Sequence, residues 1–425
     1  MAATRSDNPT RGRWFVAGAA VLLQLALGAV YAWSVFSKAL QNDDSAFNLT
    51  KSQAALPFSV TIGMIFLGTY IGGRVQDRRG PRIVALAGGI VYSIGILIAS
   101  IPSDKGDLWL LIAGYGVIAG FGLGLGYIVP IAMLQKWFPD KRGLITGIAV
   151  GGFGFGAVLT SPIAQQLVDH YARVPTRSFL WLGIGYLVMV LIGTSQFRNP
   201  PEGYTVPGWQ PATGGRIVES ARDYSQNEAL RTPQWYLLAA ILTLNVTAGI
   251  ALISVIASSA SDIAGYSAAA ASTLTGFMGL FNGGGRIFWG WLSTHTGRMT
   301  AFLGMLGLQG ACFLILPHAS SLALFAVLAA IIYLCYGGGF GTMPATAGDF
   351  FGLRNAGAIY GLMIVGWSIG GVVGPQLAAA LIGDNDNYTM AFTTIGVMAL
   401  VSMVLPLITR SPAVEQEKPK VAPAT

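Results

Sequence analysis

Long apolar segments alternate with short polar ones along the whole chain. A helix that spans a bilayer needs about 20 mostly apolar residues, and twelve segments of the 425-residue chain come close to that length or exceed it. Six lie at 14–40, 53–73, 83–103, 108–136, 144–168 and 178–197. Six more lie at 235–260, 266–290, 300–317, 321–347, 357–382 and 389–409. This pattern predicts an all-α membrane protein with twelve transmembrane helices.

Composition supports this interpretation. Hydrophobic residues make up 53% of the chain and charged residues only 10%, whereas soluble domains contain about 25% charged residues. A chain with so few charges could not cover a water-facing surface, so we expect it to lie in a lipid bilayer. The net charge of +7 does not indicate a nucleic-acid partner, because the basic residues lie in short clusters between apolar segments.

The longest polar stretch, residues 198–234, divides the chain into two halves. We expect a cytoplasmic tail at 1–13, a six-helix bundle at 14–197, a cytoplasmic linker at 198–234, a second six-helix bundle at 235–409 and a disordered tail at 410–425. Residues 126–147, "GYIVPIAMLQKWFPDKRGLITG", align with residues 340–361, "FGTMPATAGDFFGLRNAGAIYG", at an offset of 214. This repeat predicts two pseudo-symmetric bundles related by an axis normal to the membrane.

The distribution of lysine and arginine predicts the orientation. With both termini in the cytoplasm, 19 of the 25 basic residues lie in cytoplasmic segments and 5 in outer segments. Cytoplasmic segments carry the excess of basic residues in membrane proteins. We therefore expect an integral protein of a bacterial inner membrane with both termini inside. The two cysteines, Cys312 and Cys335, lie in apolar segments, and we expect neither a metal site nor a cofactor.

The remaining basic residue, Arg286, lies inside an apolar segment, in "FNGGGRIFWG" (281–290). An arginine at the centre of a bilayer costs about 2.5–3.5 kcal/mol on insertion scales, so it needs a partner or a water-filled cavity. A guanidinium binds a carboxylate in bidentate geometry, which favours a carboxylate ligand; a salt bridge that only holds helices together is the alternative. Asn282 lies four residues earlier, on the same helix face, and could donate to the same ligand.

Residues 72–82, "GGRVQDRRGPR", resemble the signature loop of the major facilitator superfamily. The resemblance implies the fold of that superfamily. It also implies that the loop acts as a latch, whose contacts stabilise one conformation of the transporter. The positions that match are Gly73, Asp77, Arg78 and Gly80. Asp77 could pair with Arg78 or with the end of a neighbouring helix, although the loop could also be a solvated basic segment. A second copy at 290–298, "GWLSTHTGR", has threonine at the acidic position, which we expect to weaken one latch.

Three further stretches are similar to the oxalate/formate antiporter family, which is related to the monocarboxylate transporters: "KWFPDKRGLITG" (136–147), "LRTPQWY" (230–236) and "NGGGR" (282–286). This resemblance implies that Arg286 is a carboxylate anchor. Oxalate antiporters of the family use a second cation, a lysine in helix 11, where this chain has Trp367. A dianion would leave one buried charge unpaired, which is costly, so we expect a monocarboxylate substrate.

Resemblance to proton-coupled monocarboxylate carriers also implies a proton-binding acid at Asp262, near the outer end of helix 7. A partly buried acid near a cation would hold its proton better when a substrate anion competes for that cation; an outer-loop aspartate without a role is the alternative. The family's binding depth suggests five aromatic lining residues, which could equally be core packing: Tyr31, Tyr127, Tyr336, Phe340 and Trp367. The tyrosine hydroxyls could hold a carboxylate by hydrogen bonds, whereas Phe340 and Trp367 could only form the boundary of its site.

Together these features predict a secondary transporter rather than an enzyme. Its ligands would be a small monocarboxylate anion, such as lactate, pyruvate or formate, and a proton, and we expect a monomer. An oxalate/formate anion exchanger is the nearest alternative, and a carboxylate sensor that does not transport is a more distant one.

Overall fold

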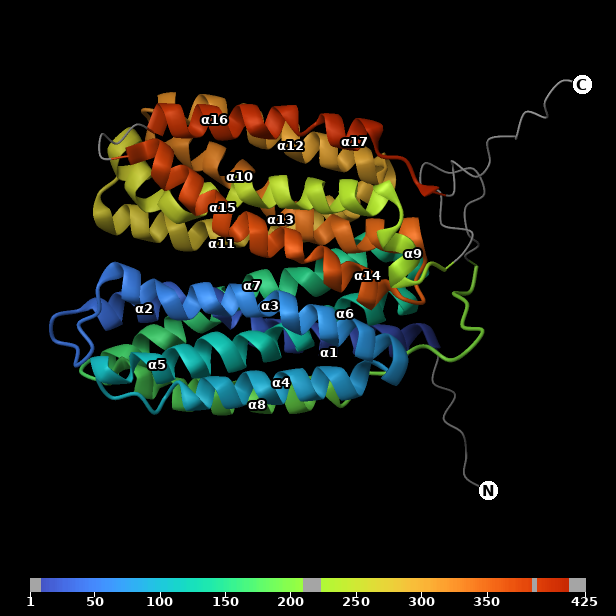
Figure 1. Ribbon diagram of the computed structural model, residues 1–425, viewed down its shortest axis with the longest axis horizontal. Helices are drawn as coiled ribbons and strands as arrows, with labels where there is room; N and C mark the ends of the chain where they lie inside the picture. The colour runs from blue at the N-terminus through green and yellow to red at the C-terminus, as the bar shows by residue number, and fades with distance from the viewer. Residues whose placement is uncertain (1–8, 209–222, 384–387, 413–425) are drawn as a thin grey trace, which may run out of the picture.

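The computed structural model describes residues 9–208, 223–383 and 388–412, which form two bundles of helices lying side by side (Figure 1). The first bundle contains α1 (Pro9–Gly28), η1 (Ala29–Ala32), α2 (Trp33–Gln41), α3 (Lys51–Arg79), α4 (Pro81–Ile98), η2 (Lys105–Asp107), α5 (Leu108–Leu111), the π-helix η3 (Ile112–Ala119), α6 (Gly120–Trp137), η4 (Pro139–Lys141), α7 (Arg142–His170), η5 (Pro175–Arg177) and α8 (Ser178–Thr194). The all-α prediction is confirmed.

The second bundle follows the short helix α9 (Gln226–Leu230). It contains α10 (Pro233–Ala264), α11 (Ala268–Thr296), α12 (Arg298–Ile315), η6 (Leu316–His318), α13 (Leu322–Phe351), α14 (Ala356–Met363), α15 (Val365–Ile382), α16 (Tyr388–Val401) and α17 (Val404–Ile408). The predicted tails and linker lie partly outside the described residues, which exclude 1–8, 209–222 and 413–425.

Eleven helices of the described chain are long and apolar enough to cross a membrane. Each matches one of the predicted segments. The twelfth segment, at 266–290, corresponds to α11, which has 29 residues but is not among those eleven. Its polar composition explains the difference, because Arg286, Asn282 and several threonines lower its hydropathy. The helix that is least suited to lipid is therefore the helix that carries the buried arginine.

The signature loop is shorter than expected. Helix α3 continues to Arg79, so Asp77 lies in its last turns rather than in a loop. Gly80 then turns the chain with φ 87°, and Pro81 starts α4. Gly297 makes the same turn in the second bundle, with φ 95°, between α11 and α12. The backbone of the second copy is thus conserved although its acidic position is lost, because glycine adopts positive φ without steric cost.

One end of the molecule, where α9 lies, is here called the linker end (Figure 1). Gln226 of α9 bonds to both bundles there. Arg74 Nε of α3 donates to its Oε1 at 2.5 Å, and its Nε2 donates to the Ala358 carbonyl of α14 at 2.7 Å.

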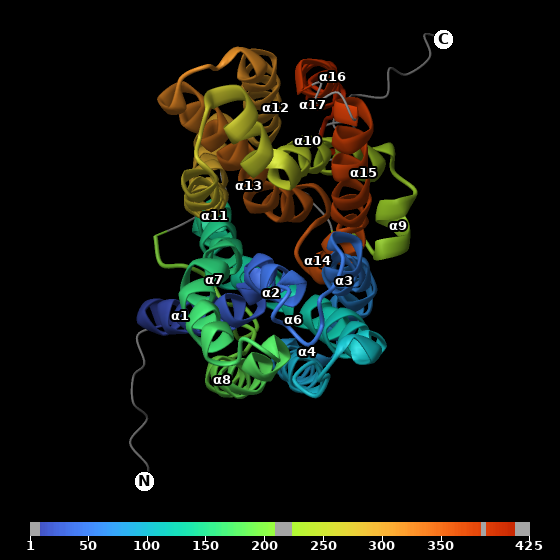
Figure 2. The same cartoon turned by 90° about the vertical axis from the view of Figure 1, so that its left-hand side faces the viewer.

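Glycines bring the two bundles into backbone contact near the linker end. Helix α7 packs on α11, and α3 packs on α14 (Figure 2). A Cβ added at Gly143 would collide with the Gly290 carbonyl, and one at Gly73 with the Gly357 carbonyl. Small residues permit such close approach of membrane helices. In this structure the bundles are therefore closed at the linker end.

We predict that Gly143→Ala separates the bundles at the linker end, because its Cβ cannot fit against Gly290. Double electron–electron resonance between spin labels at Arg79→Cys and Arg354→Cys, both exposed and one in each bundle, should show a longer distance. Gly185→Ala is the matched control, since a Cβ there has no atom within 4 Å. An unchanged distance in Gly143→Ala would mean that this contact does not close the linker end.

Candidate functional site

Arg286 lies on α11 at the interface between the bundles and is 0% exposed. Its Nε donates to Asn282 Oδ1 at 3.2 Å, which confirms that the two side chains share a helix face. Its Nη1 donates to the Val150 carbonyl of α7, in the other bundle, at 3.3 Å. The third nitrogen, Nη2, is buried and makes no hydrogen bond of normal geometry in the described part of the chain. One charged donor is therefore available to a ligand.

Aromatic rings surround the guanidinium. Arg286 Cζ lies 4.9 Å from the centroid of Phe340 and 5.7 Å from that of Phe153, within the range of cation–π attraction. Trp367 packs on the same two rings, with centroid distances of 5.0 Å to Phe340 and 6.1 Å to Phe153. Its ring is also 5.9 Å from that of Tyr127. Arg286 and Trp367 thus border one aromatic cluster.

Tyrosine hydroxyls complete the cluster. Tyr31, Tyr127 and Tyr336 lie within electrostatic range of Arg286, and Tyr360 lies next to Tyr127. All four hydroxyls are buried without a hydrogen bond of normal geometry among the described residues. Unpaired buried polar groups are rare in folded proteins and destabilising. A cation surrounded by several hydroxyls without a well-aligned hydrogen bond is chemically suited to bind a small anion.

The structure brings together the seven residues predicted to bind substrate. They come from both bundles and are Tyr31, Tyr127, Asn282, Arg286, Tyr336, Phe340 and Trp367. Phe153, Tyr360 and the Val150 carbonyl also belong to the cluster but were not predicted from the sequence. The glycine-rich run "GGFGFG" at 151–156 could have indicated Phe153, because glycines on both sides mark a close helix contact. No comparable signal indicated Tyr360.

A break in the predicted helix 357–382 positions two of the aromatic residues. Helix α14 ends at Met363 and α15 begins at Val365. The Trp367 backbone nitrogen donates to the Ile364 carbonyl at 2.9 Å, a tightened i→i+3 bond at the break. Tyr360 and Trp367 flank this break and are both buried, so the break sets the relative direction of their side chains.

Asp262 lies apart from the cluster. It is exposed near the end of α10, so the expectation that it is partly buried is wrong. Its Oδ2 accepts a hydrogen bond from the Tyr388 hydroxyl of α16 at 2.7 Å. Gly249 on the same helix is level with Tyr336, and Asp262 lies about 20 Å further along at 1.5 Å per residue. Its role in proton coupling stays a prediction, but it does not face Arg286 directly.

Asp77 connects the bundles at the linker end. Its Oδ2 accepts from the Ala358 backbone nitrogen at 2.8 Å, at the start of α14, and Lys136 Nζ lies 4.0 Å from its Oδ1. A carboxylate at a helix N-terminus is favoured by the helix dipole. Of the two expected partners, the end of a neighbouring helix is therefore the one observed, whereas the Arg78 side chain is exposed.

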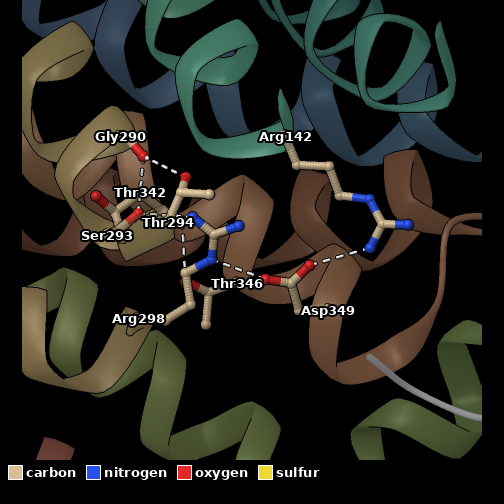
Figure 3. A network of polar contacts seen from close by, with 8 residues as sticks. All are labelled: Arg142, Gly290, Ser293, Thr294, Arg298, Thr342, Thr346 and Asp349. Atoms are coloured by element: carbon tan, nitrogen blue, oxygen red, sulfur yellow. Dashed lines mark hydrogen bonds and ion pairs between the residues drawn. The ribbon is translucent and has the colours of Figure 1, made fainter. Parts of the chain in front are cut away.

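A second charged contact lies at the same end (Figure 3). Asp349 of α13 accepts two charged hydrogen bonds. One comes from Arg142 Nη1 of α7, in the first bundle, at 3.1 Å, and the other from Arg298 Nε of α12 at 2.7 Å. Arg298 Nη1 also donates to Ser293 Oγ at 2.6 Å. All three charged side chains are buried. Arg298, from the second signature copy, thus contributes to a charged contact between the bundles despite the altered loop.

Comparison with known proteins agrees with this architecture. The family model of the Major Facilitator Superfamily matches residues 14–375 and 239–424. The chain therefore belongs to that superfamily, a family of membrane transporters rather than enzymes. Solved structures with this fold include FucP, a transporter of the superfamily in the outward conformation, with a TM-score of 0.68 and 16% identity over 92% of this chain and 98% of that one.

Characterised relatives include carriers named for small organic anions. The oxalate:formate antiporter of Oxalobacter formigenes is 28% identical over 94% of each chain. Human monocarboxylate transporter 12 is 23% identical over 94% of this chain and 81% of that protein. These matches confirm the resemblance inferred from the sequence motifs.

We predict that Asp349→Asn opens the linker end, because it removes the carboxylate charge that attracts Arg142 of the first bundle and Arg298 of the second. Removing one partner from a buried ion pair costs about 3–5 kcal/mol. The distance between spin labels at positions 79 and 354 should lengthen. Asp140→Asn is the control, since Asp140 pairs with Arg13 at 2.7 Å within the first bundle; it should lower stability without changing that distance. Equal distance changes in both variants would contradict the prediction.

Proposed function

We propose that this protein is a secondary active transporter of small monocarboxylates, such as lactate, pyruvate and formate, and that it works as a proton symporter by alternating access. The uncommitted Nη2 of the buried Arg286 carries this proposal. It offers one charged donor inside an aromatic cluster built from both bundles. The protein would act as a monomer in a bacterial inner membrane, with the linker end and both termini in the cytoplasm.

Charge balance favours one carboxylate over two. Among the described residues, Arg286 is the one cation that contacts the cluster, and Trp367 occupies the place of the second cation in oxalate antiporters. A second carboxylate would meet only aromatic rings and neutral hydroxyls, and an unpaired buried charge is strongly unfavourable. The monocarboxylate names among the relatives support the same substrate class.

The location of the cluster supports alternating access. Arg286 bonds to Val150 across the bundle interface, and the contacts at Asp77 and Asp349 close the linker end. If the bundles rock about this site, the linker-end contacts must break for the substrate to leave on that side. Substrate bound to residues of both bundles would move between the two membrane faces without a continuous channel.

We predict that purified protein in proteoliposomes takes up labelled lactate faster with an inward proton gradient, and that Arg286→Ala abolishes this uptake. Arg286→Lys keeps the charge but loses the planar fork that binds carboxylates, so uptake should fall about 10-fold or more. Arg173→Ala, at an exposed arginine outside the cluster, is the control and should transport normally. Normal uptake by Arg286→Ala would disprove the assignment of the site.

The same assay separates the alternatives. An oxalate/formate exchanger, which the Oxalobacter formigenes relative suggests, would show oxalate counterflow without a pH gradient. A carboxylate sensor would bind labelled ligand without filling the liposomes.

We predict that Asp262→Asn removes the stimulation by the proton gradient but preserves lactate exchange at equal pH, because asparagine cannot carry the coupled proton. Coupling would then pass along α10, whose Gly249 packs on Tyr336. Asp169→Asn is the matched control, since Asp169 is an exposed acid at the same end of the molecule. Gradient-stimulated uptake in Asp262→Asn would show that another group carries the proton.

A further inference from the structure

Two of the unpaired atoms in the aromatic cluster are hydrogen-bond donors only. They are Arg286 Nη2 and Trp367 Nε1, and both are buried without a hydrogen bond of normal geometry in the described part of the chain. The four unpaired tyrosine hydroxyls differ, because a hydroxyl both donates and accepts. Tyr31 lies near Tyr336, and Tyr127 near Tyr360, so small rotations could pair them. The guanidinium and the indole only donate, so each needs an acceptor: a nearby tyrosine hydroxyl, of which Tyr31 lies beside Arg286 and Tyr336 beside Trp367, or a better-aligned acceptor that enters the site.

The two donors are placed to share one small ligand. Arg286 and Trp367 both pack on Phe340 and Phe153, and Tyr336 lies near both of them. A carboxylate on Nη2 would therefore carry its neighbouring carbon toward the indole. An oxygen on that carbon is the acceptor best placed to reach Nε1.

We propose that Trp367 Nε1 donates a hydrogen bond to an oxygen on carbon 2 of the substrate, so that the protein selects 2-oxo and 2-hydroxy monocarboxylates over unsubstituted acids of the same length. This inference rests on the proposed transport function and names its substrate class. It also revises the expectation that Trp367 could only bound the substrate. A neutral donor replaces the second cation, and it suits a neutral carbonyl or hydroxyl rather than a second carboxylate.

An unsubstituted acid would leave the buried indole nitrogen with only the poorly aligned Tyr336 hydroxyl as an acceptor. Sites that hydrogen-bond a substrate group discriminate against analogues that lack it, and one unpaired buried donor corresponds to about 10-fold in affinity. Pyruvate and propionate form a suitable pair, because they have the same carbon skeleton and differ at carbon 2.

Trp289 provides a matched control. Its Nε1 is also buried without a hydrogen bond of normal geometry, but the side chain packs against Gly338 and Gly304 and lies next to the Cys335 thiol. It therefore tests whether loss of any buried indole N–H has the same effect.

The test is the ratio of kcat/KM for labelled pyruvate to that for labelled propionate in proteoliposomes. We expect the ratio to be about 10 or more in the wild type, and to fall to about 1 in Trp367→Phe, which keeps an aromatic ring but removes the N–H. The change should come from pyruvate, with propionate uptake retained. Trp289→Phe should keep the wild-type ratio.

Several outcomes would overturn the inference. In Trp367→Phe, an unchanged ratio, or an equal loss of uptake for both substrates, would mean that Trp367 lines the site without donating a hydrogen bond to the substrate. A wild-type ratio near 1 would overturn it without any variant, and would leave the proposed transport function intact. If Trp367→Phe does not fold, thermal unfolding of the wild-type protein provides the test. Pyruvate should then raise the unfolding temperature more than propionate does, and equal shifts would overturn the inference. Failure of folded wild-type protein to transport any monocarboxylate would instead disprove the proposed function.

Discussion

The buried charge of Arg286 is the constraint around which the rest of this protein is arranged. A guanidinium in the membrane interior must be compensated, and here the Val150 carbonyl, Asn282 and two aromatic rings provide part of that compensation. Glycines on two neighbouring helices, Gly147 of α7 and Gly341 of α13, face the Arg286 carbonyl, where a Cβ would collide. Three helices therefore meet closely at this residue, and the compensation comes from both bundles.

The same interface contains the contacts that close the linker end. Glycines bring α7 to α11 and α3 to α14, and the carboxylates of Asp77 and Asp349 join the bundles at that end. The proposed substrate site and these charged contacts thus share helices α7, α13 and α14. Binding of an anion to Arg286 would change the electrostatic attraction across the interface between the bundles, while the linker-end contacts oppose separation of the bundles at that end. This arrangement gives a physical basis for coupling occupancy to conformation.

Hydropathy predicted the helices well, because the bilayer imposes both a minimum length and an apolar surface on every spanning helix. The prediction was weakest at helix ends. Asp77 was expected in a loop but lies within α3, since the helix continues past the apolar stretch into its basic end. The break at Ile364 was also missed, because α14 and α15 together form one uninterrupted apolar segment.

The sequence by itself determined the fold class, the superfamily motif and the exceptional position of Arg286, since each depends on local composition or on residues close together in the chain. Tyr31, Tyr127, Tyr336, Phe340 and Trp367 could be proposed from their depth, but only the tertiary structure placed them around one cation. It also decided that Phe153 and the Val150 carbonyl belong to the cluster, that Asp262 faces Tyr388 rather than Arg286, and that Trp367 has an unpaired donor. Such facts depend on the packing of helices that are distant in sequence, and the helical pattern of a chain does not specify which neighbours each face will meet.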